Sequence, residues 1–297
     1  MKIVEVTYRY GEAGGAGRRR PADAEEARQR LDEGSRSIAS LLDAAAEGEG
    51  VAQRVVHVDP RDLGLAGERS GAPAQRPFAA VLGCSDARVP IELIFNEGPN
   101  DLFVVRVAGN GLGAEGLGSL NYAVDHLGES LKLVVVLGHS GCGAVSAAVD
   151  VFLKPQNYLA LASNHALRNI LDRLLVVVHV AAKRITASYG SEIARHSRYR
   201  EALIESAVVY NAALGAFTAE QELARVNAQG LRAAYGVWLL ESHEVWAPRA
   251  GSRECAGLAF PPADPAAFAA LADAVAESDR IAALFSRGAD SSPDEAH

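Results

Sequence analysis

The chain has 297 residues, of which 49% are hydrophobic and 22% charged, so it is long enough for one large or two ordinary globular domains. Its 29 Lys and Arg against 37 Asp and Glu give a formal net charge of −8, and the field of such a chain attracts neither nucleic acid nor an anionic membrane. Three cysteines are too few for a disulfide scaffold and favour a reducing compartment.

Secretion and membrane insertion are not expected either. Residues 1–10 show no basic segment followed by an apolar stretch, as a secretory signal would. The longest uncharged apolar run lies between Lys132 and Asp150, where it is interrupted by His139 and is too short to span a bilayer comfortably. The sequence therefore predicts a soluble, cytoplasmic protein with no membrane insertion and no nucleic-acid partner.

Residues 1–77 are predicted to have little regular structure apart from one helix. Residues 1–22 hold a glycine-rich stretch and three consecutive arginines, which are typical of a flexible N-terminal arm. A helix is predicted from Pro21, because acidic residues occupy its first turn and apolar residues recur at helical spacing. Residues 47–77 are rich in Gly, Pro and charge and are predicted to be irregular surface, in which 55–58 could form a short strand.

Three short, continuous apolar runs follow, over residues 78–83, 102–107 and 133–137. Strands that are buried on both faces of a parallel sheet have this pattern. Helical stretches are predicted after the second and third runs, at 118–127 and 143–153. This alternation of strand and helix indicates an α/β fold with right-handed crossovers.

The rest of the chain is predicted to be mainly helical over residues 158–228, with a late strand pair at 235–240 and 244–246. Asp264 as a cap with Pro265 at the first helical position predicts a terminal helix that runs to Ser286. The predicted fold class is α/β, with a central, mainly parallel β-sheet of about four strands flanked by helices, and an N-terminal helical arm.

Two clusters of chemically active side chains follow two of the predicted strands. Segment 84–88 (CSDAR) and segment 139–142 (HSGC) each come directly after an apolar run. Ligands bind at the carboxyl ends of the strands in open α/β sheets, and neighbouring strands would bring the two clusters together. Cys84, His139 and Cys142 would then form a three-ligand set suited to Zn²⁺, with the fourth tetrahedral position open as in catalytic sites.

Each of these residues also has an ordinary structural interpretation. A lone Cys84 at a strand end would be a small buried hydrophobe, and a lone histidine would be a satisfied core or surface residue. Asp86 and Arg88, two and four residues after the first cysteine, could form a plain structural ion pair. The two clusters together favour the metal site, and the ion-pair alternative stays open.

The residues around the two clusters resemble the β-class carbonic anhydrases. Gln75, nine residues before Cys84, stands where many members of that family have a Gln that binds substrate. The middle motif departs from the family's usual pattern, because Val107 takes the place of an Asn. The segments that carry the resemblance are 83–90 (GCSDARVP), 105–110 (VRVAGN) and 138–145 (GHSGCGAV).

The resemblance is strongest over residues 75–150 and is compatible with the chain from 23 to 247. It divides the sequence into a flexible N-terminal arm over residues 1–22, a catalytic domain over 23–250 and a C-terminal Ala-rich helical extension over 251–297. Members of the family pair through N-terminal arms, which implies a homodimer or a homotetramer.

The function that the resemblance implies is that of a zinc-dependent carbonic anhydrase. Cys84, His139 and Cys142 would hold one Zn²⁺, and the hydroxide bound to it would attack CO₂ to give bicarbonate and a proton. Asp86 would accept the hydroxide proton while Arg88 holds its carboxylate, and a released Asp86 could take the fourth zinc position.

Gln75 completes the site that the resemblance implies, because its side-chain amide would donate to a substrate oxygen.

Two other functions remain open. A hydrolase of carbon disulfide or carbonyl sulfide would use the same zinc set and would differ in the width and access of its pocket. A non-catalytic zinc-binding regulatory protein is the other, although Asp86, Arg88 and Gln75 argue against it. Residues 111–116 (GLGAEG) satisfy the dinucleotide-binding fingerprint literally, but the acidic residue that should follow a second strand is missing, so nucleotide binding is not expected.

Overall fold

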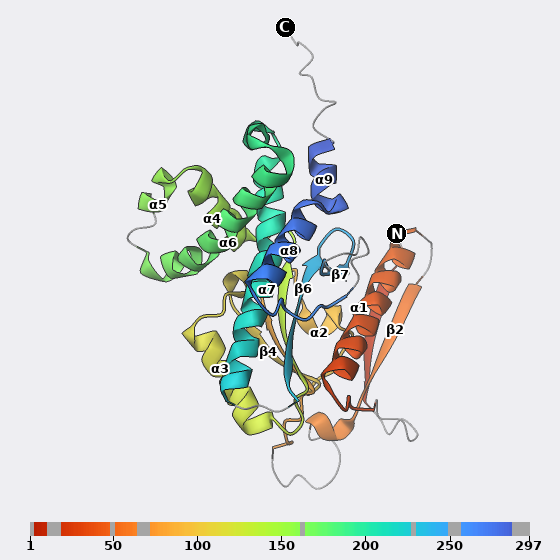
Figure 1. The fold of residues 1–297 in the computed structure, drawn as a ribbon. Coiled ribbons are helices and arrows are strands. Elements are labelled where there is room, and N and C mark those ends of the chain that lie inside the picture. The colour runs from red at the N-terminus through yellow and green to blue at the C-terminus, as the bar shows by residue number, and fades with distance from the viewer. Residues whose placement is uncertain are drawn as a thin grey trace.

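A five-stranded β-sheet runs through the middle of the computed structural model, which describes residues 3–10, 19–47, 51–63, 72–160, 164–226, 230–248 and 257–286 (Figure 1). The strands lie in the order β4-β3-β5-β6-β7, and all pairs are parallel except that of β6 with β7. The predicted α/β fold with a mainly parallel sheet is confirmed. The strands are β3 (Ala79–Gly83), β4 (Leu102–Arg106), β5 (Leu133–His139), β6 (Arg232–Leu239) and β7 (Glu244–Trp246).

The central strands β3 and β5 are buried along their whole length, which explains their unbroken apolar sequences. Successive side chains of a strand point to opposite faces of the sheet. Ala80 and Leu82 accordingly join the apolar cluster on one face, whereas Ala79 and Val81 join the cluster on the other. Each face therefore needs a cover of helices.

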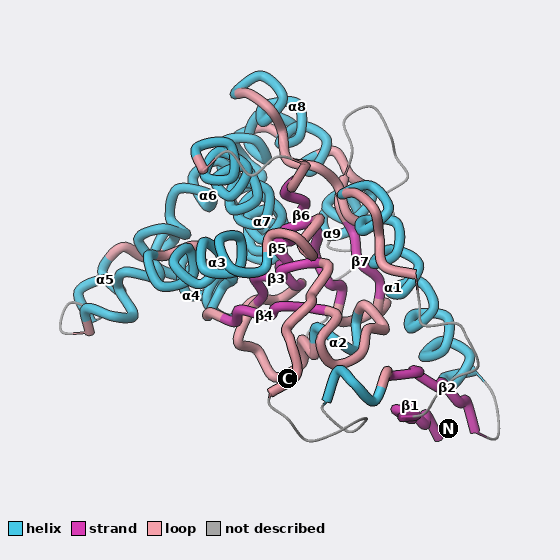
Figure 2. Tube along the Cα trace, turned by 90° about the horizontal axis from the view of Figure 1, so that it is seen from below, coloured by secondary structure: helices cyan, strands magenta, loops and turns pink. Residues whose placement is uncertain are grey.

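Helices cover both faces of the sheet, and Figure 2 shows α3, α4, α6 and α7 on one side of it and α1 on the other. Among the helices of the described residues, α7 alone has the length and composition that could cross a membrane, and 67% of its most apolar window is buried in the fold, as in a core helix. The helices are α1 (Ala24–Glu47), α2 (Ile91–Ile94), α3 (Ala114–Leu127), α4 (Gly143–Leu153), α5 (Gln156–Ala160), α6 (His165–Tyr189), α7 (Tyr199–Arg225), α8 (Pro265–Ala276) and α9 (Asp279–Ser286). Short 3-10 turns occur at Pro60–Leu63, Ala108–Asn110 and Ser191–Arg195.

The N-terminal region contains a second, two-stranded sheet that the sequence analysis did not expect. Strand β1 (Ile3–Tyr10) pairs in parallel with β2 (Val51–Val58), beside α1 and apart from the central sheet (Figures 1 and 2). β1 lies in the arm predicted for residues 1–22, where no strand was predicted, and the irregular surface predicted for residues 47–77 is wrong for 51–58, of which only 55–58 was considered as a strand. The signal was the alternation of apolar and polar residues in VEVTYRY, which is typical of a strand.

The C-terminal region forms two helices where one was predicted. Asp264 caps α8 as expected, because its carboxylate accepts a hydrogen bond from the N–H of Ala267 at 2.8 Å. The chain breaks at Ser278, whose hydroxyl donates to the carbonyl of Val275 at 2.7 Å, and α9 begins at the next residue. A side-chain hydrogen bond to the backbone competes in this way with continuation of a helix.

Several predictions fall on residues outside the described ranges. These are the glycine-rich stretch at 11–17, the first of the three arginines (Arg18), the loop at 64–71 and the end of the chain from residue 287.

Candidate metal centre

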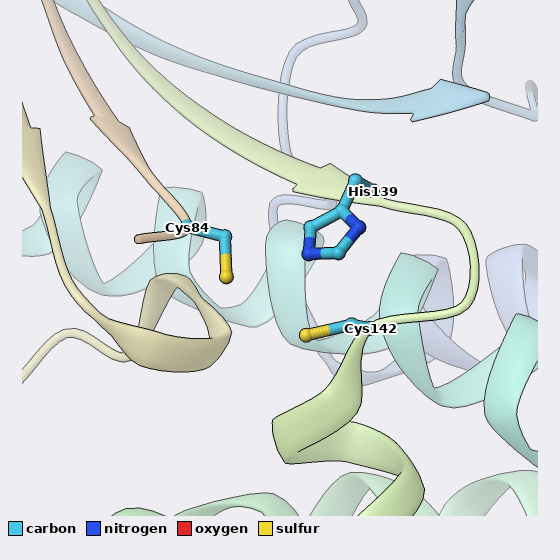
Figure 3. A group of neighbouring side chains, drawn as sticks. All are labelled: Cys84, His139 and Cys142. Atoms are coloured by element: carbon cyan, nitrogen blue, oxygen red, sulfur yellow. The ribbon is translucent and has the colours of Figure 1, made fainter. Parts of the chain in front are cut away.

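Three ligating side chains meet at the carboxyl edge of the sheet. Cys84 follows β3 and His139 ends β5, and these strands are neighbours with Gly83 opposite Leu137. Cys142 lies at the start of α4, so that one short loop carries two of the three side chains. Figure 3 shows the three side chains pointing toward one another, and their ligating atoms all lie within 4.8 Å of one another.

His139 is oriented as a metal ligand. Its side chain is fully buried, and its Nδ1 lies 3.0 Å from the carbonyl oxygen of Ser140. Since a carbonyl can only accept, Nδ1 carries the proton and Nε2 presents its lone pair. Nε2 has no hydrogen-bond partner among the described residues, and a buried polar atom left in that state costs about 1–3 kcal/mol. A cation bound between the three side chains would satisfy it.

The two cysteines supply the sulfur donors that Zn²⁺ prefers. Both are free and buried. The hydrogen bond from Cys142 lowers the pKa of the Cys84 thiol, with further help from the backbone N–H of Gly109, 3.3 Å from Sγ. The same sharing of one proton raises the pKa of Cys142. Two sulfurs and one imidazole nitrogen, buried and convergent, fit a zinc ion.

Gly109 can donate to that sulfur because of its backbone conformation. It has a φ of 66°, in the left-handed region, and a Cβ there would lie 3.1 Å from Cβ of Ala144. A side chain would therefore be strained by the backbone and crowded by α4. Gly109 is the residue type that this approach to Cys84 requires.

Asp86 and Arg88 form the predicted pair at the edge of the three ligands. Arg88 donates from Nε and Nη2 to the two carboxylate oxygens of Asp86 at 3.0 and 2.7 Å, and its backbone N–H donates to the same carboxylate at 2.9 Å. These bonds hold the pKa of Asp86 well below its usual range. Oδ2 of Asp86 lies 3.9 Å from Nε2 of His139, so the carboxylate faces the metal-ligand group.

Arg106 is a residue of this site that the sequence analysis missed. It ends β4 and donates from Nε to the carbonyl of Cys84 at 3.0 Å and from Nη2 to the carbonyl of Asp86 at 2.5 Å. It thereby fixes the backbone on which both side chains stand. The motif at 105–110 contained this residue, but nothing in its spacing showed where the side chain would reach.

Gln75 does not lie near the three ligands of its own chain. It precedes β3, whereas Cys84 follows that strand, and the five residues between the two ends span roughly 16 Å at about 3.3 Å per residue. Gln75 is exposed, and its neighbours are held by Asn100, which donates to the carbonyl of Ala74 at 3.1 Å and accepts from the N–H of Arg76 at 2.9 Å. One chain alone therefore does not bring Gln75 to the site.

Two carboxylates hold the loop between His139 and Cys142, and the sequence analysis identified neither. The hydroxyl of Ser140 donates to Oε2 of Glu241 at 2.9 Å, and the N–H of Gly141 donates to Oε1 of Glu205 at 3.0 Å. Burial raises the pKa of the Glu241 carboxyl, but the hydrogen bonds from Arg280, Ser140 and the backbone and the charge of Arg280 together lower it below its usual value. These contacts join residues that are 64 and 101 positions apart in the sequence, so no local sequence pattern predicts them.

Comparison with known proteins shows that the segment containing this site resembles a protein family. Residues 79–220 match the family model described as carbonic anhydrase. Cys84, Asp86, Arg88, His139 and Cys142 lie inside that segment, as does Glu205, whereas Gln75, Glu241 and Arg280 lie outside it.

The chain is also similar to curated proteins. It is 50% identical over 78 residues to carbonic anhydrase 2 of Mycobacterium tuberculosis (strain CDC 1551 / Oshkosh), which covers 26% of this chain and 37% of that protein. It is 48% identical over 87 residues to the carbonic anhydrase of Mycolicibacterium smegmatis, which covers 29% and 41%. The matches thus span well under half of the length of these relatives.

Among solved structures, the β-carbonic anhydrase CcaA is similar with a TM-score of 0.46 and 25% identity, over 62% of this chain and 85% of that one. The Coccomyxa β-carbonic anhydrase in complex with acetazolamide is similar with a TM-score of 0.43 and 19% identity, over 76% and 86%.

Proposed function

We propose that this chain is a zinc-dependent carbonic anhydrase that interconverts CO₂ with bicarbonate and a proton. Residues 79–220 belong to the carbonic anhydrase family, and the motifs around the site are those of its β class. The observation that carries the proposal is the convergence of Cys84, His139 and Cys142 within 4.8 Å, with the Asp86 carboxylate facing them. A purely structural zinc would be closed by a fourth protein ligand. Among the described residues, only these three His, Cys, Asp or Glu side chains lie close enough together to bind one metal ion.

The three ligands would hold the ion, and the ion would supply Lewis-acid chemistry that makes water acidic enough to react near neutral pH. The chain's own residues do the rest. Ser140 fixes the ring of His139 through Nδ1, so that Nε2 faces the ion. Gly109 and Arg106 fix Cys84 from its sulfur and from its carbonyl.

Asp86 is the proposed proton acceptor. Arg88 binds both of its oxygens and keeps the carboxylate ionised, so that one oxygen can accept the proton of a group between it and His139 in a hydrogen bond and orient that group. The plain ion-pair interpretation explains the contact between Asp86 and Arg88, but it does not explain why the carboxylate lies 3.9 Å from the histidine's ligating nitrogen.

Gln75 would bind substrate in the site of a second copy. Its exposed position at the opposite end of β3 allows contact with another chain and not with its own ligands. This supports the homodimer or homotetramer that we propose. Exposed apolar residues of the N-terminal sheet, such as Ile3 (66% exposed) and Val51 (51% exposed), offer area for such contacts.

Two inactive variants can test this arrangement. In a mixed dimer of Q75A and C84S chains, one of the two sites would combine Gln75 from the C84S chain with Cys84 from the Q75A chain. Activity that returns on mixing would support the shared site, and a mixture as inactive as both parents would contradict it.

We also propose a cytoplasmic location, which the two buried free cysteines support because a reducing compartment keeps them available for metal. Cell fractionation with an antibody against the chain would test it.

Stopped-flow CO₂ hydration tests the activity, on wild type assayed for zinc and on the variants C84S and D86A. We expect fast hydration by wild type, loss of both zinc and activity in C84S, and loss of activity with zinc retained in D86A. One zinc per chain without CO₂ hydration would overturn the proposal, and assays with carbonyl sulfide and carbon disulfide would then show whether the same site acts on those substrates.

A further inference from the structure

The loop that carries two of the three ligands is held by side chains from two distant elements. Between His139 and Cys142 stand only Ser140 and Gly141. The hydroxyl of Ser140 donates to Glu241 in the turn after β6, and the N–H of Gly141 donates to Glu205 on α7.

Both carboxylates are also bound by one guanidinium group, that of Arg280 on α9. Arg280 donates from Nε to Oε2 of Glu205 at 3.1 Å and from Nη2 to the same oxygen, and it donates from Nη1 to Oε1 of Glu241. Each carboxylate thus uses one oxygen for the loop and the other for Arg280. The planar fork of arginine suits this double contact, which the single ammonium of a lysine cannot reproduce.

We propose that Arg280 is a positioning residue for the metal ligands, which clamps α9 onto the 139–142 loop through Glu205 and Glu241. The inference rests on the proposed zinc site and adds a requirement to it. A helix beyond the segment that matches the family would be needed to hold zinc tightly, because it fixes the groups that fix the ligands.

Few contacts separate Arg280 from the metal ligands. Without the guanidinium, Glu205 would keep a carboxylate whose side chain is only 14% exposed and would lose its counter-charge, so it would move toward water or recruit it. Gly141, with a φ of 60°, would then lose the acceptor of its N–H. Movement of Ser140 would turn His139, because the carbonyl of Ser140 fixes the ring.

α9 has other contacts that keep it in place without Arg280. Ile281 is 1% exposed. The centroid of the Phe285 ring lies 4.8 Å from the ring centroid of Tyr189 and 5.2 Å from that of His196. A substitution of Arg280 should therefore release the clamp and leave the helix docked.

The experiment compares zinc affinity in the full-length chain. The Zn²⁺ dissociation constant is measured by competition with a chelator for wild type, R280A, R280K and the control R184A. Arg184 also ties the C-terminal region to the body of the fold, through Asp273 on α8 at 3.0 Å, but among the described residues it makes no hydrogen bond or ion pair with the 139–142 loop. We expect R280A to bind zinc about 10–100-fold more weakly, as groups that orient metal ligands do, R280K to recover part of this loss, and R184A to bind as wild type does.

A second readout does not depend on the metal. Hydrogen exchange of the 139–142 peptide in the metal-free chain should be faster in R280A than in R184A, because the amide of Gly141 loses its fixed acceptor. If R280A does not fold, the zinc affinity of E241A tests the clamp through the bond between Glu241 and the Ser140 hydroxyl, since Glu241 is 54% exposed and does not belong to the buried core.

The possible outcomes are distinct. Equal zinc affinity and equal exchange in R280A and wild type would overturn the clamp and leave the proposed function standing. Equal losses in R280A and R184A would also overturn it, since they would indicate general loosening of the C-terminal region. A wild-type chain that binds no zinc would overturn the proposed function, and the exchange comparison would still decide whether Arg280 orders the loop.

Discussion

The Nδ1 atom of His139 lies 3.0 Å from the carbonyl oxygen of Ser140, within a loop of four residues that also ends in Cys142. This bond sets the orientation of the ring from the histidine's own backbone neighbour. The lone pair of Nε2 consequently points at the sulfurs of Cys84 and Cys142 before any ion binds (Figure 3). The site is therefore preorganised by the fold, and this has consequences for metal removal.

Removal of metal with a chelator should abolish activity and leave the fold intact. Cys84 and His139 stand at the ends of β3 and β5, whose residues are buried in the apolar clusters of the sheet, so these strands hold the ligands in place. Circular dichroism should be unchanged. Added zinc should raise the free energy of unfolding by about 4 kcal/mol at 1,000 times its dissociation constant, and unfolding upon metal removal would contradict this prediction.

Arg88→Ala should lower kcat/KM about 10²–10⁴-fold, the usual contribution of a positioned proton acceptor, without loss of zinc. The side chain of Arg88 is 60% exposed and makes its side-chain bonds to Asp86, so its removal frees the carboxylate without opening the core. Steady-state CO₂ hydration with a parallel zinc assay measures both effects. Arg198→Ala is the matched control, because it removes an exposed ion pair with Glu201 far along the chain. Equal activity of the two variants would refute the role of Arg88.

Gly109→Ala should lower the free energy of unfolding by about 1–3 kcal/mol, a typical cost of strain at a special backbone position. The φ of 66° disfavours any side chain, and the new methyl group would lie 3.1 Å from Cβ of Ala144. Gly118→Ala is the control, because a Cβ there meets nothing within 4 Å. Chemical denaturation of both variants measures the difference, and a Gly109→Ala protein as stable as wild type would show that α4 can move away at no cost.

Tyr210→Phe should lower the free energy of unfolding by about 1 kcal/mol, the net contribution of an ordinary hydrogen bond. Its hydroxyl donates to the carbonyl of Ala272 on α8 at 2.9 Å in a buried position. The substitution removes one atom and keeps the ring, so the packing of α7 is otherwise preserved. Urea denaturation followed by fluorescence is the measurement, and a stability gain would mean that α8 is not docked by this bond.

Much of the fold could be predicted from sequence because its central strands are buried on both faces. The apolar runs at β3 and β5 identify these strands without any knowledge of their partners, whereas β4, whose run was read in the same way, lies at the edge of the sheet and is only partly buried. Strand β1 was missed although its apolar residues alternate with Glu5, Thr7 and Arg9, because its partner lies 48 residues away. A two-stranded sheet beside a glycine-rich stretch has a weak local signal.

The same distinction applies to the site. Cys84, Asp86 and Arg88 lie within five residues of sequence, and His139 and Cys142 within four. Short sequence segments are therefore enough to predict their chemistry. Arg106, Glu205, Glu241 and Arg280 act through long side chains that reach across the tertiary structure, and charged residues of these types also cover the surface. Only the packed fold shows which of them touch the ligand loop.

The central claim is that Cys84, His139 and Cys142 hold a zinc ion with one position open to water. X-ray absorption at the zinc edge of the purified protein tests it most directly. We expect two sulfur ligands at about 2.3 Å and one imidazole nitrogen at about 2.0–2.1 Å, with one further light atom. A shell of nitrogen and oxygen alone, or one unchanged by Cys84→Ser, would contradict it.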